Sequence, residues 1–174
     1  MNAEEHKLID QIRAAFNHVT LEDGISLNMT KYKDSGGSMQ KYKERATSDE
    51  RCNWWAISDA TLEKFTVTFP FTDLLGFRFY IPAYMIWTIR NHRNSDSIIS
   101  DSTVYAIDPN HYLFKEVSFH KWFTREQIGA MVEFLSYAVR NGDTLDGEVA
   151  MENIGKIKAA QRGNAPDAYG ADDL

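Results

Sequence analysis

Cysteine is almost absent from this sequence. Cys52 is the only cysteine among 174 residues, so the chain cannot form an internal disulfide and does not fit a secreted, disulfide-stapled scaffold. The first five residues, Met1 to Glu5, are acidic and lack the basic-then-apolar layout of a signal peptide. We therefore expect a cytoplasmic protein in a reducing compartment.

Long apolar runs and an excess of positive charge are also missing. The longest apolar stretch, residues 81–89, is interrupted by Pro82 and Thr88 and is far shorter than the roughly 20 residues that a membrane span needs. The chain holds 25 Asp and Glu against 19 Lys and Arg, a net charge of −6, whereas a general nucleic-acid binder needs a basic face. We expect neither a membrane nor a nucleic acid as partner. The acidic charge is compatible with a basic protein partner, although mild acidity is common among soluble proteins.

The sequence shows no motif for catalysis, phosphate binding or metal binding. Gly36 and Gly37 belong to neither a Walker loop nor a dinucleotide fingerprint, and no two histidines are four residues apart. Cys52 could pair with a histidine as nucleophile and base, but a small apolar residue is the simpler interpretation. His111 and His120 could converge with Asp108, yet scattered residues of this kind usually belong to the polar surface. The histidines are His6, His18, His92, His111 and His120. We expect no cofactor and no metal, and no reaction can be read from the chain.

Helical patterns dominate what is present. Asn2 and Glu5 predict a capping box, and apolar residues then repeat at helical spacing up to Val19. Thr124 and Gln127 predict a second capping box, which opens a helix with one apolar stripe. We predict a mainly α fold that forms a single compact helical domain over residues 1–142. A weak helix over 143–160 and a disordered tail over 161–174 follow it.

The middle of the chain gives mixed signals. The alternation Phe65-Thr66-Val67-Thr68-Phe69 favours one short β element ended by Pro70, which would make the fold α+β. Thr72 or Asp73 predicts a helical turn that stops at Gly76, and Pro82 predicts the first turn of a new helix that runs to about Arg90. A short, mostly solvated helix is expected within Met39 to Arg51.

Three stretches resemble a bacterial domain family of unknown function. They are Ile12-Arg13-Ala14-Ala15-Phe16 through Ser26-Leu27, the block Gly76-Phe77-Arg78-Phe79-Tyr80-Ile81-Pro82-Ala83-Tyr84, and Phe123-Thr124 with Gln127, Phe134 and Leu135. The central stretch is similar to the family's Phe-Arg-Tyr-Tyr-Leu-Pro-Ala block. The resemblance extends from about Lys7 to Arg140 and ends before Gly142. It implies no activity, cofactor or catalytic residue.

The aromatic block that follows Gly76 supplies the candidate site. Tyr80, Tyr84 and Trp87 share one helical face, which either forms a core or grips a partner. Arg78, between two phenylalanines, needs a carboxylate such as Asp73, or else it binds a ligand together with the tyrosine hydroxyls. Of the adjacent Trp54 and Trp55, one is expected in the core and the other at a rim or interface.

Two functions remain open from the sequence. The first is a non-catalytic protein-binding module, such as an immunity or regulatory protein, with candidate binding residues Arg78, Tyr80, Tyr84, Trp87 and Trp54. Exposure of Trp54 or Tyr84 would favour it, and burial of both would weaken it. The alternative is a small enzyme or small-molecule binder with a pocket around Arg78, Tyr80 and Tyr84. The sequence does not identify the partner or the oligomeric state.

Overall fold

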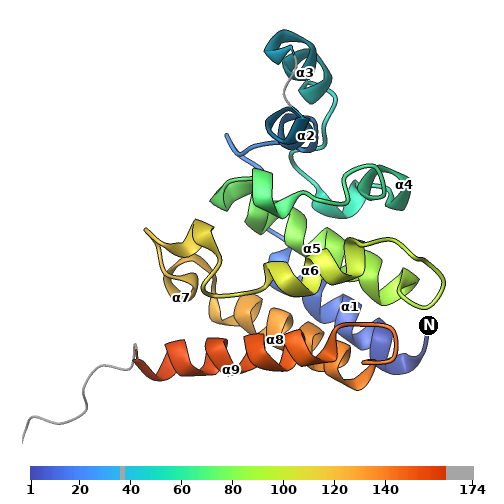
Figure 1. Cartoon of the computed structure of the whole chain (residues 1–174), viewed down its shortest axis with the longest axis vertical. Coiled ribbons are helices and arrows are strands. Elements are labelled where there is room, and N and C mark those ends of the chain that lie inside the picture. Colours follow the sequence, from blue (N-terminus) through green and yellow to red (C-terminus); the bar gives the residue numbers. More distant parts are fainter. Residues whose placement is uncertain (36–37, 164–174) are drawn as a thin grey trace, which may run out of the picture.

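The protein is built from helices joined by turns, as the computed structural model shows (Figure 1). The structure describes residues 1–35 and 38–163, and this part of the chain contains no β-strand. The helices are α1 (Ala3–Phe16), α2 (Leu27–Ser35), α3 (Met39–Ala46), α4 (Asp59–Leu62), α5 (Leu74–Asn91), α6 (Ile99–Ala106), α7 (Phe119–Trp122), α8 (Arg125–Arg140) and α9 (Gly147–Gly163). Three 3₁₀ turns lie between them, η1 (Trp54–Ala56), η2 (Phe69–Phe71) and η3 (Tyr112–Phe114). The predicted mainly α, single compact domain is confirmed.

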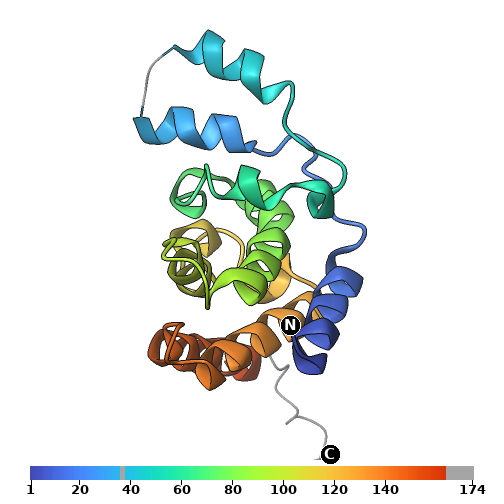
Figure 2. The same cartoon turned by 90° about the vertical axis from the view of Figure 1, so that its right-hand side faces the viewer.

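Helix α5 lies at the centre of the arrangement. Helices α1 and α6 pack against it, and α8 packs against α1. Helices α8 and α9 run side by side along the lower edge of Figure 1, and α9 also contacts α6. At the opposite end α2 and α3 pair as a hairpin, which Figure 2 shows above the rest of the molecule. The molecule is therefore a helical bundle with a hairpin of helices at one end.

Local sequence signals start the two best-predicted helices. In α1 the Asn2 side chain accepts a hydrogen bond from the Glu5 amide, and the Glu5 carboxylate accepts one from the Asn2 amide. In α8 Thr124 and Gln127 form the same reciprocal pair. Each pair satisfies two amide groups that a helix leaves without an internal partner at its start. Both predicted capping boxes are confirmed.

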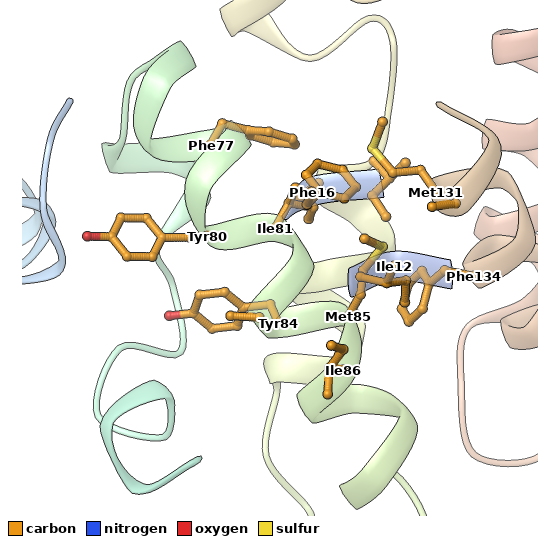
Figure 3. Packing of buried hydrophobic residues seen from close by; sticks show 14 of the residues in the cluster. Ile12, Phe16, Phe77, Tyr80, Ile81, Tyr84, Met85, Ile86, Met131 and Phe134 are labelled. Atoms are coloured by element: carbon orange, nitrogen blue, oxygen red, sulfur yellow. The ribbon is translucent and has the colours of Figure 1, made fainter. Parts of the chain in front are cut away.

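Helix α5 is apolar around most of its circumference and is buried on several sides. Thirteen of its eighteen residues are buried, as expected for a helix without a polar face. In Figure 3, Ile81 and Met85 face α1 and α8, whereas Tyr80 and Tyr84 point to the other side. The helix therefore joins two layers of the molecule. No helix in the described ranges is both long and apolar enough to cross a membrane.

Pro82 does not begin a helix, contrary to the prediction. It lies inside α5, which runs without interruption from Leu74 to Asn91. Pro82 has no amide hydrogen for the carbonyl of Arg78, and an interior proline costs about 3 kcal/mol of helix stability. Asp73 caps the first turn by accepting a hydrogen bond from the Gly76 amide at 2.8 Å. This cap and the burial of the helix offset the cost, so Gly76 continues the helix instead of ending it.

The β element predicted at Phe65–Phe69 is also wrong. Residues 65–68 form a loop with a bend at Thr66 and Val67, and η2 begins at Phe69. The Phe65 carbonyl accepts hydrogen bonds from the hydroxyls of Tyr84 and Thr68, at 2.6 and 2.8 Å. A strand needs a neighbour to pair with its backbone, and the structure describes none. The five residues do not alternate in burial either, since Thr68 is buried and Val67 is 42% exposed.

Helix α9 shares the core of the preceding helices. Leu145, Ala150 and Ile157 are buried, and the Asn153 amide donates to the Val104 carbonyl of α6 at 3.1 Å. The helix continues to Gly163. Most of the tail predicted to be disordered, residues 164–174, lies outside the described residues, as do residues 36–37 of the predicted glycine loop.

A buried ionic network ties the ends of three helices together. The Glu5 side chain is 1% exposed and lies 2.6 Å from the Arg93 guanidinium. It also accepts a hydrogen bond from the Tyr137 hydroxyl at 3.0 Å. Burial alone would raise the pKa of Glu5, but hydrogen bonds from Arg93, the Asn2 backbone and Tyr137 outweigh it and lower the pKa to about 2. The carboxylate is therefore ionised at neutral pH and joins α1 to the ends of α5 and α8.

His92 extends this network to the turn before α9. Its ring lies 2.8 Å from the Tyr137 hydroxyl and 2.7 Å from the Thr144 hydroxyl. Burial lowers the pKa of His92, and the nearby Arg93 charge lowers it further. Burial raises the pKa of Tyr137 to about 12, with the neighbouring Glu5 carboxylate adding to the effect. Both rings are therefore neutral near pH 7 and serve as hydrogen-bonding partners.

We predict that Glu5→Gln destabilises the fold by about 2 kcal/mol at neutral pH. The change removes the charge of a buried carboxylate that accepts hydrogen bonds from Tyr137 and from Arg93, whose side chain is 46% exposed. The matched control is Glu4→Gln, whose carboxylate pairs with Arg140 where both side chains are about half exposed. That change should stay within about 0.5 kcal/mol. Urea unfolding of the three proteins measures the difference.

The same substitution has a predicted pH dependence. The pKa of Glu5 falls from its ordinary 4.5 to about 2 in the folded protein. Its stabilising contribution is therefore complete above pH 4.5 and is lost as the pH falls toward 2. The difference in the free energy of unfolding between wild type and Glu5→Gln should therefore shrink over this range. A difference in stability that stays constant down to pH 2 would contradict the lowered pKa of Glu5.

The two adjacent tryptophans give a second matched test. Trp54 is 1% exposed and its indole N–H donates to the Phe16 carbonyl at 2.8 Å, whereas Trp55 is 50% exposed. Trp54→Ala should cost about 3–5 kcal/mol through loss of packing, and Trp55→Ala less than about 1 kcal/mol. Equal losses of stability for the two variants, measured by thermal or urea unfolding, would show that the two side chains are not divided between core and surface.

Candidate functional site

Four of the five residues predicted as a binding site lie in the core. Tyr80, Tyr84, Trp87 and Trp54 are all buried. The Leu27 amide donates to the Tyr80 hydroxyl at 3.2 Å, and the Tyr84 hydroxyl lies 2.7 Å from that of Thr68. Burial raises the pKa of both tyrosines well above the ordinary value, so both hydroxyls stay protonated. Of the two interpretations of the aromatic face, the structure shows the core.

Arg78, the fifth residue, reaches the surface at a different place. Its guanidinium lies 3.3 Å from the Glu22 carboxylate and 4.6 Å from the centre of the Trp122 ring. The expected partner, Asp73, instead accepts hydrogen bonds from the amides of Gly76 and Ile25. None of the main cavities in the described part of the chain is lined by Arg78. The pocket predicted around Arg78, Tyr80 and Tyr84 therefore has no counterpart among these cavities.

The candidate catalytic and metal-binding residues do not assemble into a recognisable site. Cys52 is exposed, and His92 is committed to Tyr137 and Thr144. Within residues 1–35 and 38–163, no group of three or more His, Cys, Asp or Glu side chains could hold a metal ion.

An apolar groove opens between α6, η2 and the start of η3. Its volume is about 330 Å³. Among its walls, Val67, Ile98 and Tyr105 are large apolar side chains with 42%, 52% and 53% of their surface exposed. The full lining is Val67, Phe69, Pro70, Ile98, Asp101, Ser102, Tyr105, Ala106 and His111. Exposed apolar side chains that line one concavity are typical of a binding surface.

Hydrogen bonds hold the walls of the groove in place. Tyr84, within the core, fixes residues 65–68 through the Phe65 carbonyl and Thr68. The Tyr112 hydroxyl donates to the Pro70 carbonyl at 3.0 Å, and the exposed Tyr112 ring extends the apolar surface beside the groove. Burial lowers the pKa of His111, so its ring is neutral near pH 7. The groove is therefore a preformed cleft, and among its described lining residues Asp101 is the one acidic or basic side chain besides the neutral His111.

A second hollow lies next to the groove and is acidic. It has a volume of about 740 Å³, and its lining is Val139, Gly142, Leu145, Asp146, Gly147, Glu148, Met151 and Glu152. The Tyr105 hydroxyl in the groove donates to the Asp146 carboxylate in this acidic hollow at 2.7 Å. One lining residue of the groove is therefore hydrogen-bonded to one lining residue of the acidic hollow.

Two of the segments that line the concavities contain no lysine or arginine. Residues 94–114 and 141–155 hold seven of the 25 carboxylates and none of the 19 basic residues. They carry a formal charge of −7, which exceeds the net charge of −6 for the whole chain. The seven are Asp96, Asp101, Asp108, Asp143, Asp146, Glu148 and Glu152. Lys156 pairs with Asp108 and Glu152. Among the ion pairs within residues 1–35 and 38–163, none involves the other five.

Comparison with known proteins gives a family but no function. No curated protein and no solved structure matches the chain. The model of a family described as a family of unknown function (DUF6714) matches residues 4–160. The match includes the aromatic block and extends through most of α9, beyond Gly142, where the resemblance seen in the sequence ended. The chain therefore belongs to the DUF6714 family of unknown function.

Proposed function

We propose that the protein is a non-catalytic protein-binding module that docks a partner in the apolar groove. The observation that carries this proposal is the gathering of Val67, Ile98 and Tyr105, all strongly exposed, around one preformed cleft. Aromatic and aliphatic anchors of this kind dominate the energetics of protein interfaces. A module without its own chemistry acts by occupying or tethering its partner, as regulatory and immunity proteins do.

The residues that support a protein-binding function are not the ones that the sequence suggested. Burial of Trp54 and Tyr84 removes the support that their exposure would have given. The groove supplies exposed apolar surface in their place. We place the module in the reducing cytoplasm of a bacterial cell, which is compatible with a single, exposed and unpaired Cys52.

Site-specific photocross-linking tests the proposal. A benzoylphenylalanine residue would replace Ile98 or Val67 in the full chain, and the control would carry it at Trp55. Trp55 is 50% exposed and does not line the groove. After irradiation in source cells, we expect one discrete protein adduct from positions 98 and 67 and none from position 55. Equal adducts from all three positions, or none from the groove, would refute the proposal.

A second substitution in the same chain makes the test specific for the groove. Ile98→Asp should abolish the adduct formed from position 67, because it places a charge on the apolar wall. The matched change Trp55→Asp should leave that adduct unchanged. An adduct with twice the mass of the chain would instead assign the groove to self-association.

A further inference from the structure

We propose that the partner's docking segment is basic and apolar, with its apolar side chains in the groove and its Lys or Arg side chains over the acidic hollow. This inference rests on the proposed function and specifies the chemistry of the partner. It follows from the contact between the two concavities and from the distribution of charge around them.

The geometry places the two kinds of surface within reach of one short segment. Tyr105 lines the groove and Asp146 lines the acidic hollow, and their side chains are hydrogen-bonded at 2.7 Å. Packing of α6 on α9 holds the two elements together. A segment that fills the groove and continues past Tyr105 therefore comes close to the Asp146 carboxylate.

The charge around the two concavities selects for a basic partner. Asp101 lines the groove, and Asp146, Glu148 and Glu152 line the acidic hollow. Of these, Glu152 is offset by Lys156. The pKa of Asp146 is lowered by a hydrogen bond from the Val149 amide and a second from Tyr105, so this carboxylate is ionised at neutral pH. An acidic segment or a phosphate backbone would be repelled here, whereas a cationic one is attracted.

The shape of a basic side chain also suits this surface. Lysine and arginine have apolar stems that pack on apolar groups while the charged head remains near water and carboxylates. The exposed Tyr105 ring and Met151, which is 62% exposed, provide such apolar surface beside the carboxylates. A neutral apolar segment would leave the carboxylates unpaired, and a purely basic one would leave the groove empty.

Selection from a displayed library of random peptides tests the chemistry without knowledge of the partner. The full chain would be the target. Peptides that also bind the Ile98→Asp variant would be discarded, because they bind outside the groove. We expect the retained peptides to be enriched in Lys and Arg next to large apolar residues. Their affinity should fall as salt is raised, because exposed charges are screened.

Charge reversal then separates this surface from the net charge of the protein. Asp101→Lys with Glu148→Lys should weaken the selected peptides by about tenfold or more, since like charges are placed opposite the basic residues. The control, Asp10→Lys with Glu44→Lys, makes the same change in net charge at exposed positions that line neither concavity. It should alter affinity less than about twofold because screening limits distant charges.

The outcomes of these experiments distinguish the inferred charge of the partner from the proposed binding function itself. Groove-dependent peptides that are neutral or acidic, or that bind the Asp101→Lys, Glu148→Lys variant unchanged, would overturn the inference about charge and leave the binding module intact. A selection that yields no peptide dependent on Ile98 would overturn both.

Discussion

The burial of α5 on opposite sides is the constraint on which the rest of the structure depends. One side packs Ile81 and Met85 against α1 and α8. The other side carries Tyr80 and Tyr84, whose hydroxyls bond the backbone at Leu27 and Phe65. Through Tyr84 the core helix fixes residues 65–68, and these lead into the wall formed by Val67, Phe69 and Pro70. The shape of the groove is therefore a consequence of how the core is packed.

Local signals in the sequence predict the helices that begin with a cap. The pairs Asn2–Glu5 and Thr124–Gln127 act within four residues, so their effect can be read without knowing the rest of the fold. Pro82 and residues 65–69 were misread because tertiary burial outweighs local preference there. The cost of an interior proline is offset by packing around α5. Residues 65–68 are held by hydrogen bonds to Tyr84 of α5 and not by a paired strand.

The candidate site could be predicted less well than the fold. Aromatic density in α5 indicates either a core or a binding surface. Only the structure shows that Trp54, Tyr80, Tyr84 and Trp87 belong to the core. The groove joins residues from position 67 to position 111, and its contact with Asp146 joins a third segment. No local pattern brings these together. The sequence carries one signal of the acidic surface: residues 94–114 and 141–155 contain seven carboxylates and no lysine or arginine.

Native-state hydrogen exchange of the unliganded protein tests the central claim most directly. If α5 is the buried centre that organises both layers, the amides of residues 77–89 that have hydrogen-bond partners should be among the slowest to exchange and should open only with global unfolding. Those of α3, whose described side chains are mostly exposed, should exchange much faster. Exchange in α5 as fast as in α3 would contradict the account, because it would show that the helix is not held in a core.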